Sequence, residues 1–280
     1  MQRWSVRIVL AILCLISGAM TPWAAAQVLP AHYGQSELPP LDNPGKTILL
    51  LFSHGSEPEF FNDPCEMQKY NAAYGVPAIV HDLYGQTIGD MKIVVDGYCT
   101  PTRRGYYDRN TQSGDAKVLL RSRDIEVRAK NFIAAGVPAK QIFLVGHSAG
   151  GWASLMLKAR TPELANSVIA FAPAFAGRRG SRHPGWQALH EKYVGELQKV
   201  TRLDAMVFAI ENDAFEAPEH LKLLSAIPGV TQVVLSDFKI EQVFCDKSTS
   251  SHALVRNPCF RHTQLSRLKK YIKQRVQETP

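Results

Sequence analysis

One short segment constrains the fold of this chain more than any other. The apolar run at residues 141–145 (QIFLV) leads into residues 146–150 (GHSAG), and residues 151–159 continue with helical character. A glycine-X-serine-X-glycine segment between a buried strand and a helix is typical of a sharp turn that lifts the serine hydroxyl clear of the backbone. The flanking glycines remove side chains that would collide in that turn. The segment therefore predicts a nucleophile at Ser148 rather than an idle serine in a glycine-rich turn.

Apolar runs alternate with helical patterns along the rest of the chain. A run typical of a strand buried on both faces occurs at 47–53, and further strand candidates occur at 91–98, 168–172, 205–210 and 230–235. Apolar side chains recur at helical spacing over 115–135 and again from Leu265 to Val276. Residues 76–83 fit either a strand or an extended loop. The alternation predicts an α/β fold with a mostly parallel central sheet and helices on both faces.

A serine nucleophile needs a base to accept its proton, and the base needs an acid to orient it. In folds built on this turn, the partners follow in the order serine, acid, histidine. Asp213 follows the predicted strand 205–210, and His252 lies between the last predicted strand and the C-terminal helix. Both positions belong to the carboxyl edge of the sheet, where ligands bind in open α/β folds. We expect His252 as the base and Asp213 as the acid, with Glu211 as the close alternative.

Other histidines and acids fit these roles less well. His262 is expected to begin the C-terminal helix, and His190 and His220 are expected on helix surfaces. Asp237 and Asp246 are more distant candidates for the acid.

The oxyanion that forms during acyl transfer requires preorganised N–H donors. One expected donor is the backbone N–H of Ala149, at the start of the helix after the nucleophile. The other is the N–H of Ser56, in the loop after the strand 47–53. We expect His54 in the same loop to support the turn rather than to act as a base.

The chain resembles the α/β-hydrolase superfamily, and most of all its esterase and dienelactone-hydrolase-like branches. The resemblance rests on SHGS at 53–56, GHSAGG at 146–151, AIEND at 209–213 and SSH at 250–252. Dienelactone hydrolases are similar in fold but use cysteine where this chain has Ser148. The resemblance therefore implies an esterase-like reaction rather than dienelactone hydrolysis.

The expected reaction is hydrolysis of a small-molecule carboxylic ester through an acyl-enzyme, with no cofactor required. Two alternatives remain open. An amidase or peptidase would use the same three residues, because the sequence does not reveal the leaving group. The other alternative is a non-enzymatic binding protein on the same fold. The presence of nucleophile, acid and histidine in the expected order argues against it.

Residues 1–26 have the order of a secretory signal peptide. Arg3 and Arg7 precede the apolar run 8–16, and three alanines at 24–26 precede Gln27. The run is short for a membrane anchor, and no later stretch reaches 18 apolar residues. We expect cleavage after Ala26, export to the periplasm or the medium, and no stable membrane insertion afterwards. Residues 27–280 are expected to form one domain, with 175–200 as a possible cap segment.

Charge and cysteine content narrow the partners and the compartment. Loss of Arg3 and Arg7 would lower the formal charge from +7 to +5, and no zinc-finger spacing or aromatic RNA-binding motif accompanies this mild excess. Nucleic acid is therefore not an expected partner. Cleavage after Ala26 would remove Cys14 and leave four of the five cysteines, and an even number in an exported chain predicts two disulfides with three possible pairings, of which the local one closes the shortest loops. It joins Cys65 to Cys99 and Cys245 to Cys259.

Overall fold

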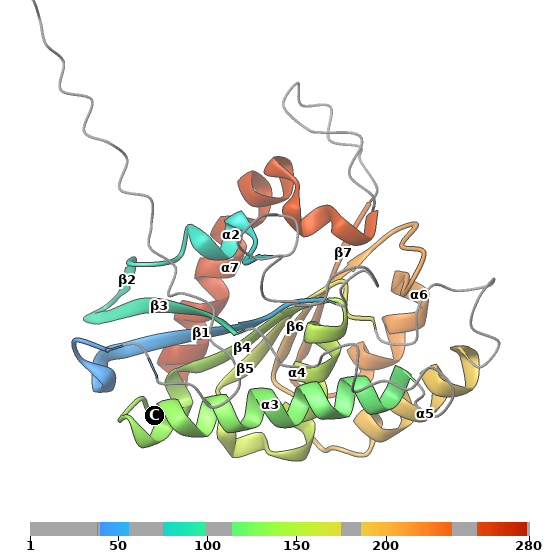
Figure 1. Cartoon of the computed structure of the whole chain (residues 1–280). Helices are drawn as coiled ribbons and strands as arrows, with labels where there is room; N and C mark the ends of the chain where they lie inside the picture. The colour runs from blue at the N-terminus through green and yellow to red at the C-terminus, as the bar shows by residue number, and fades with distance from the viewer. Residues whose placement is uncertain are drawn as a thin grey trace, which may run out of the picture.

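The computed structural model describes residues 38, 40–55, 75–98, 114–174, 186–236 and 251–278. Within these residues the chain forms a seven-stranded sheet with helices on both sides (Figure 1). The strands are β1 (Thr47–Ser53), β2 (Thr87–Ile88), β3 (Met91–Tyr98), β4 (Ile142–His147), β5 (Ser167–Phe171), β6 (Ala205–Ile210) and β7 (Val230–Leu235). Their order is β2-β3-β1-β4-β5-β6-β7, and only β2 and β3 pair antiparallel. The predicted α/β fold with a mostly parallel sheet is confirmed.

The central strands β1, β4, β5 and β6 bury side chains on both faces of the sheet, which explains why they read as continuous apolar runs, whereas the edge strand β7 is partly exposed. Along β1, Leu49 and Leu51 join one core cluster. Ile48, Leu50 and Phe52 point the opposite way, into a second cluster. All five side chains are fully buried, as the alternation of side chains along a strand between two helix layers requires.

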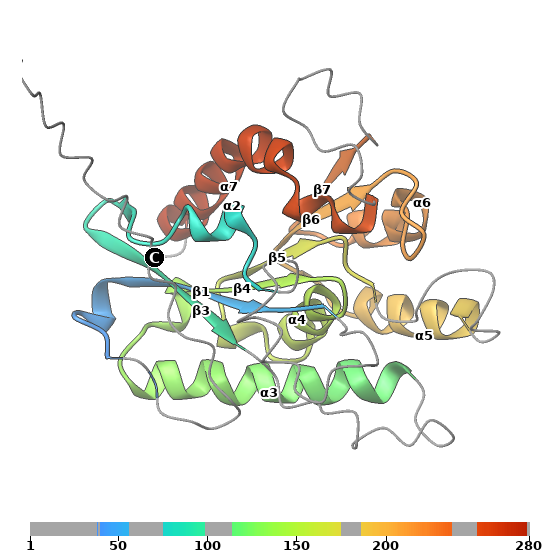
Figure 2. The same cartoon turned by 45° about the horizontal axis from the view of Figure 1, so that its top comes forward.

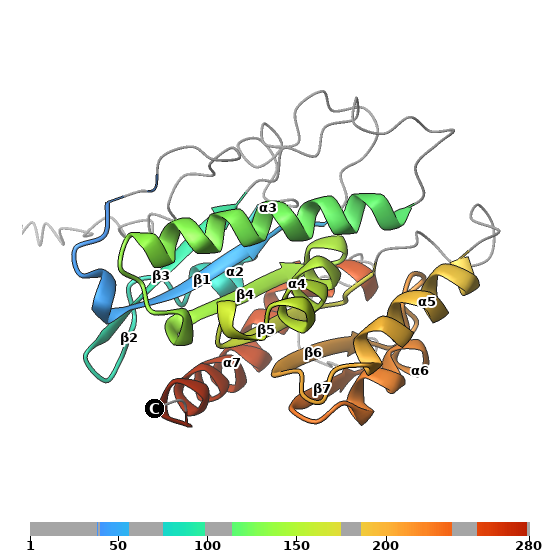
Figure 3. The ribbon, with the colours of Figure 1, turned by 90° about the horizontal axis from the view of Figure 1, so that it is seen from below.

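Helices cover the two faces unequally. The face that includes Leu49 carries α3 (Gly114–Ala134), α4 (Ala149–Arg160) and α5 (Trp186–Gln198), and Figure 3 views the molecule from that side. The other face carries α2 (Ala78–His81) and α7 (Pro258–Glu278), which lie next to each other in Figure 2. The remaining helices are α6 (Pro218–Leu221) and the 3-10 turns η1 (Pro44–Lys46), η3 (Ala139–Gln141), η4 (Pro162–Leu164), η5 (Lys222–Ala226) and η6 (Ser251–Arg256). None of the helices in the described ranges is long and apolar enough to cross a membrane.

Two local expectations differ from the structure. Residues 76–83, expected as a strand or an extended loop, contain the helical turn α2, because Ile79, Val80 and Leu83 are spaced to pack on one side of a helix. The C-terminal helix begins at Pro258, so His262 lies within the helix and is exposed. Asn257 caps this helix, since its Oδ1 accepts the N–H of Cys259 at 2.8 Å, and proline is favoured at the first helical position.

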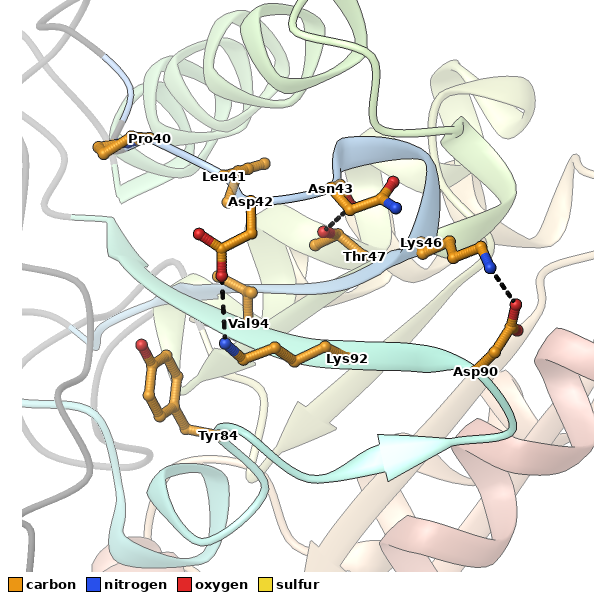
Figure 4. Close-up of a pocket in the computed structure, with 10 residues that line it drawn as sticks. All are labelled: Pro40, Leu41, Asp42, Asn43, Lys46, Thr47, Tyr84, Asp90, Lys92 and Val94. Carbon is orange, nitrogen blue, oxygen red and sulfur yellow. Dashed lines mark hydrogen bonds and ion pairs between the residues drawn. The ribbon is translucent and has the colours of Figure 1, made fainter.

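A pocket of about 170 Å³ lies at the amino ends of β1 and β3 (Figure 4). Two ion pairs line it: Lys46 Nζ lies 2.8 Å from Asp90 Oδ2, and Lys92 Nζ lies 3.5 Å from Asp42 Oδ2. Each lysine therefore faces a carboxylate. The β1 strand separates this pocket from the carboxyl edge of the sheet by roughly 20 Å.

Candidate active site

Ser148 occupies the sharp turn between β4 and α4. Its backbone has φ 54° and ψ −123°, a conformation that residues other than glycine rarely adopt. The turn is held on both sides, because the Ser148 N–H donates to the Phe171 carbonyl at 3.0 Å and the Ser148 carbonyl accepts from the Trp152 N–H at 3.0 Å. The strained turn leaves the serine side chain partly exposed at the carboxyl edge of the sheet.

The glycines of the motif are required by close backbone approach. A Cβ at Gly146 would lie 2.4 Å from the Gly150 carbonyl carbon, and a Cβ at Gly150 would lie 2.2 Å from the Ser53 carbonyl oxygen. Neither distance is sterically possible. The start of α4 can thus approach the end of β1 closely only with glycine at position 150.

Ser148, His252 and Asp213 form one hydrogen-bonded chain. His252 Nδ1 lies 2.8 Å from Asp213 Oδ2, and His252 Nε2 lies 2.9 Å from Ser148 Oγ. An ionised carboxylate only accepts hydrogen bonds, so Nδ1 carries the ring proton and Nε2 is free to accept the serine proton. The structure thus brings together the three residues that the sequence predicts as nucleophile, base and acid.

The carboxylate that contacts the histidine belongs to Asp213 and not to Glu211. The Asp213 side chain is fully buried, and its Oδ1 accepts the N–H of Phe215 at 2.7 Å. Between the two acids, Asn212 takes a positive φ of 59° and turns the chain. Glu211 is exposed.

Three neighbours hold His252 in place. The Phe215 ring lies 4.2 Å from the imidazole, centroid to centroid. His147 Nε2 donates to the His252 carbonyl at 2.8 Å, since a carbonyl only accepts. Ser251 Oγ donates to the Asn212 carbonyl at 2.9 Å and so ties η6 to the turn that carries Asp213.

His147 itself is neutral. Burial lowers its pKa well below the usual value, and the nearby charges of His252 and Arg256 act in the same direction. The neutral tautomer with hydrogen on Nε2 leaves Nδ1 without a hydrogen-bond partner among the described residues.

The expected oxyanion donors are only partly within the described residues. Ala149 is the buried first residue of α4, where backbone N–H groups have no partner inside the helix and the helix dipole favours negative charge. Ser56 lies outside the described residues. The last described residue of that loop, Gly55, borders Ser148: a Cβ there would lie 3.1 Å from Ser148 Cβ. His54 is buried, and its Nδ1 donates to the Gly55 carbonyl at 2.7 Å, which fits the expected supporting role.

The expectation that His190 lies on the surface is wrong. His190 is buried on α5, with Nδ1 3.2 Å from Glu216 Oε2 and its ring 6.4 Å from that of Trp152. The sequence contains the signal: Tyr193, Val194 and Leu197 follow at helical spacing and are buried on the same side. His220 is partly buried on α6, with its ring 6.0 Å from that of His190.

Several expectations fall outside the described residues. They concern the leader 1–26, the cysteines Cys65, Cys99 and Cys245, the acids Asp237 and Asp246, and residues 175–185 of the possible cap. The rest of that cap segment contains α5, whose buried side chains join the same core cluster as those of α4. Cys259 is buried at the start of α7. In the part of the chain that the structure describes, no group of three or more His, Cys, Asp or Glu side chains is arranged to hold a metal ion.

Comparison with known proteins gives one family match and a set of similar structures. Residues 49–247 match the model of the alpha/beta hydrolase family. A search of curated proteins gave no match. Among solved structures, a predicted CIB-like hydrolase from Thermoplasma acidophilum is 15% identical, with 82% of this chain and 89% of that chain covered and a TM-score of 0.46.

Two further solved structures extend the likeness. A peroxisomal alpha-beta-hydrolase from Saccharomyces cerevisiae is 13% identical over 85% of this chain and 78% of that chain, with a TM-score of 0.49. A structure from a study of two prolyl endopeptidases is 13% identical, with a TM-score of 0.50, and covers 83% of this chain but 34% of its own. At identities this low the likeness concerns the fold.

Proposed function

The chain belongs to the alpha/beta hydrolase family, and from that premise we propose that it hydrolyses carboxylic esters of small molecules through an acyl-enzyme. The observation that carries the proposal is the hydrogen-bonded chain from Ser148 Oγ through His252 to Asp213. This arrangement supplies an activated nucleophile, a general base and a residue that orients the base.

In the first half of the proposed reaction, Ser148 Oγ attacks the ester carbonyl carbon while His252 Nε2 accepts the hydroxyl proton. The buried Asp213 carboxylate stabilises the imidazolium that forms. The carbonyl oxygen becomes an oxyanion, which the Ala149 N–H at the start of α4 would stabilise. Cleavage of the carbon–oxygen bond then releases the alcohol, which takes the proton from His252.

In the second half, water replaces the alcohol. His252 Nε2 accepts a proton from the water as its oxygen attacks the acyl carbonyl, and the serine oxygen leaves as the same proton returns to it. The products are a carboxylic acid and the free enzyme, so the cycle uses one water and no cofactor.

We also propose that the protein acts outside the cytoplasm. The support is the order of charge, apolar run and alanines in residues 1–26, all of which lie outside the described residues. N-terminal sequencing of protein recovered from the periplasm or the medium should begin at Gln27, and a chain that retains Met1 there would contradict cleavage.

The test combines a panel of substrates with two serine variants, Ser148→Ala and Ser154→Ala. p-Nitrophenyl esters of graded acyl length are compared with matching p-nitroanilides and peptides. Ser148→Ala should lower ester hydrolysis by about six orders of magnitude and abolish labelling by a fluorophosphonate. Ser154→Ala is the control, because Ser154 lies on the same helix with its Oγ bonded to the Gly150 carbonyl at 2.8 Å, away from the three-residue chain.

Each outcome selects one reading. Faster cleavage of the anilides or peptides than of the esters would favour an amidase or peptidase with the same three residues. Undiminished hydrolysis by Ser148→Ala would remove Ser148 as the nucleophile. Absence of both turnover and labelling in the unaltered protein would leave the binding-protein reading.

A further inference from the structure

Arg121 is a buried arginine on α3 whose guanidinium reaches the loop beside Ser148. Its side chain is fully buried. Its Nη1 donates to the His54 carbonyl and, at 2.9 Å, to the Gly55 carbonyl. Because burying a guanidinium costs free energy, an apolar side chain would fill a purely packed position at lower cost. We therefore look for the role of this buried charge in the two carbonyls that it contacts.

Those two carbonyls belong to the backbone that borders the nucleophile. A Cβ at Gly55 would lie 3.1 Å from Ser148 Cβ and 3.3 Å from His147 Nδ1, so no side chain separates this backbone from the elbow. The Gly55 carbonyl accepts a second bond from His54 Nδ1 at 2.7 Å. The donors of Arg121 and His54 together fix the direction of both carbonyls.

Fixing the carbonyls also fixes N–H groups. A trans peptide unit is planar, and its C=O and N–H bonds point in opposite directions. With the His54 carbonyl directed to Arg121 on α3, the Gly55 N–H of the same peptide unit must point away from that helix. Oxyanion stabilisation depends on donors that are already aimed before the charge develops.

A second buried arginine on the same helix shows what an ordinary structural role looks like. Arg128 lies seven residues after Arg121, is also fully buried, and binds the buried Asp96 through two bonds. Its Nε lies 2.8 Å from Asp96 Oδ2 and its Nη2 lies 3.2 Å from Oδ1. Arg128 thus ties α3 to a carboxylate of β3, whereas Arg121 ties α3 to the backbone after β1.

We propose that Arg121 is a positioning residue for oxyanion stabilisation: it holds the His54–Gly55 backbone so that the Gly55 N–H faces the tetrahedral intermediate formed on Ser148. The inference rests on the proposed ester hydrolysis. Only the backbone up to Gly55 enters this proposal, because the Ser56 N–H expected from the sequence lies outside the described residues.

The test compares Arg121→Gln, Arg121→Lys and the unaltered protein on one p-nitrophenyl ester and one trifluoromethyl ketone, which forms a tetrahedral adduct with an active serine. Rates are divided by the number of sites titrated with a fluorophosphonate. Arg121→Gln should lower kcat per site by about 100-fold with KM nearly unchanged, since a displacement of about 1 Å in an active site has that effect. Affinity for the ketone should fall by the same factor, and Arg121→Lys should recover part of both.

The control is the double variant Arg128→Met/Asp96→Leu, which removes the other buried arginine of α3 together with its partner and should leave kcat per site unchanged. If Arg121→Gln lowers only the titratable fraction, with kcat and ketone affinity per site intact, Arg121 is structural and the inference is overturned. Should the Gln variant not fold, Arg121→Lys alone carries the same comparison. Failure of the proposed function itself would appear separately, as Ser148→Ala retaining ester hydrolysis.

Discussion

His252 Nδ1 lies 2.8 Å from Asp213 Oδ2, although the two residues stand 39 positions apart in the chain. The contact forms because β6 and β7 are parallel neighbours, so the segments that follow them meet at one edge of the sheet. The carboxylate is fully buried, whereas the imidazole is 14% exposed. The fold therefore fixes the position of the Asp213 carboxylate. This carboxylate accepts the hydrogen bond from Nδ1 and so favours the tautomer of His252 with the proton on Nδ1.

We predict that Asp213→Asn keeps the fold and lowers kcat by about four orders of magnitude. The amide can donate to Nδ1, which favours the tautomer that cannot accept the serine proton. Glu211→Gln is the matched control, since Glu211 is exposed two residues earlier and should change kcat little. Steady-state kinetics with thermal unfolding of both variants checks this, and a larger loss in Glu211→Gln would exclude Asp213 as the acid.

A second prediction concerns the glycine that lets α4 approach β1. Gly150→Ala should lower the free energy of unfolding by at least about 2 kcal/mol, because its Cβ would meet the Ser53 carbonyl oxygen at 2.2 Å. Gly195→Ala on α5 is the opposite control, since a Cβ there meets nothing within 4 Å. It should raise that free energy by roughly 0.5–1 kcal/mol. Urea unfolding gives the free energy of unfolding of both variants. Equal values for Gly150→Ala and Gly195→Ala would refute the steric account.

The sequence predicted the sheet well because buried parallel strands are marked by long apolar runs. The buried strands β1 and β6 begin and end at the predicted residues, and so does the partly exposed edge strand β7. The short helix α2 escaped prediction because one helical turn has no full period to detect. The start of α7 lies earlier than the apolar spacing from Leu265 onward indicates, because the Asn257 cap and the proline after it begin the helix about two turns before that apolar face.

The site was predicted as a set of residues but not as an arrangement. Position after a strand pointed to Asp213 and Glu211 alike, and the positive φ of Asn212 is what separates them. The surface position predicted for His190 is wrong because the apolar residues on its face of α5 bury it, although histidine is a polar residue type. Arg121 gave no signal at all, because its contacts join residues 66 and 67 positions apart, and such pairs cannot be read from one sequence.

A third prediction concerns pH and His147. Because burial lowers its pKa, His147 stays neutral in the folded protein, while the unfolded chain takes up a proton below about pH 6.5. The unfolded state then binds more protons, so this residue lowers the free energy of unfolding by up to about 1.4 kcal/mol per pH unit as pH falls below that value. Above it, the contribution is constant.

The measurement is the free energy of unfolding of the unaltered protein and of His147→Gln between about pH 5 and 7. Glutamine does not titrate and keeps an N–H donor for the His252 carbonyl. The unaltered protein should lose stability more steeply on acidification than the variant. Asp124, whose pKa burial raises to about 6, contributes with the opposite sign but equally in both proteins, so it cancels in the difference. Identical slopes would show that His147 is not held neutral.

The last prediction is that a Cys245–Cys259 disulfide braces the segment that carries His252. His252 stands seven residues from each cysteine. Cys259 is buried where α7 begins, and Cys245 lies outside the described residues. Residues 247–251 (KSTSS) offer little apolar area to hold the base in place, and a displacement of about 1 Å can cost 100-fold in rate. Closing a loop of about 15 residues also stabilises the fold by about 3 kcal/mol in the chain-entropy model.

Two readings of that bridge differ in what its removal does. If it positions the base, Cys245→Ser/Cys259→Ser should lose ester hydrolysis at temperatures where circular dichroism still shows the folded spectrum. If it only fastens α7 to the sheet, activity should fall in step with unfolding. Cys65→Ser/Cys99→Ser is the matched control, since it removes the other predicted bridge, far in sequence from His252. Peptide mapping that pairs Cys245 with Cys65 or Cys99 would exclude the brace, because neither of those cysteines closes the loop around the histidine.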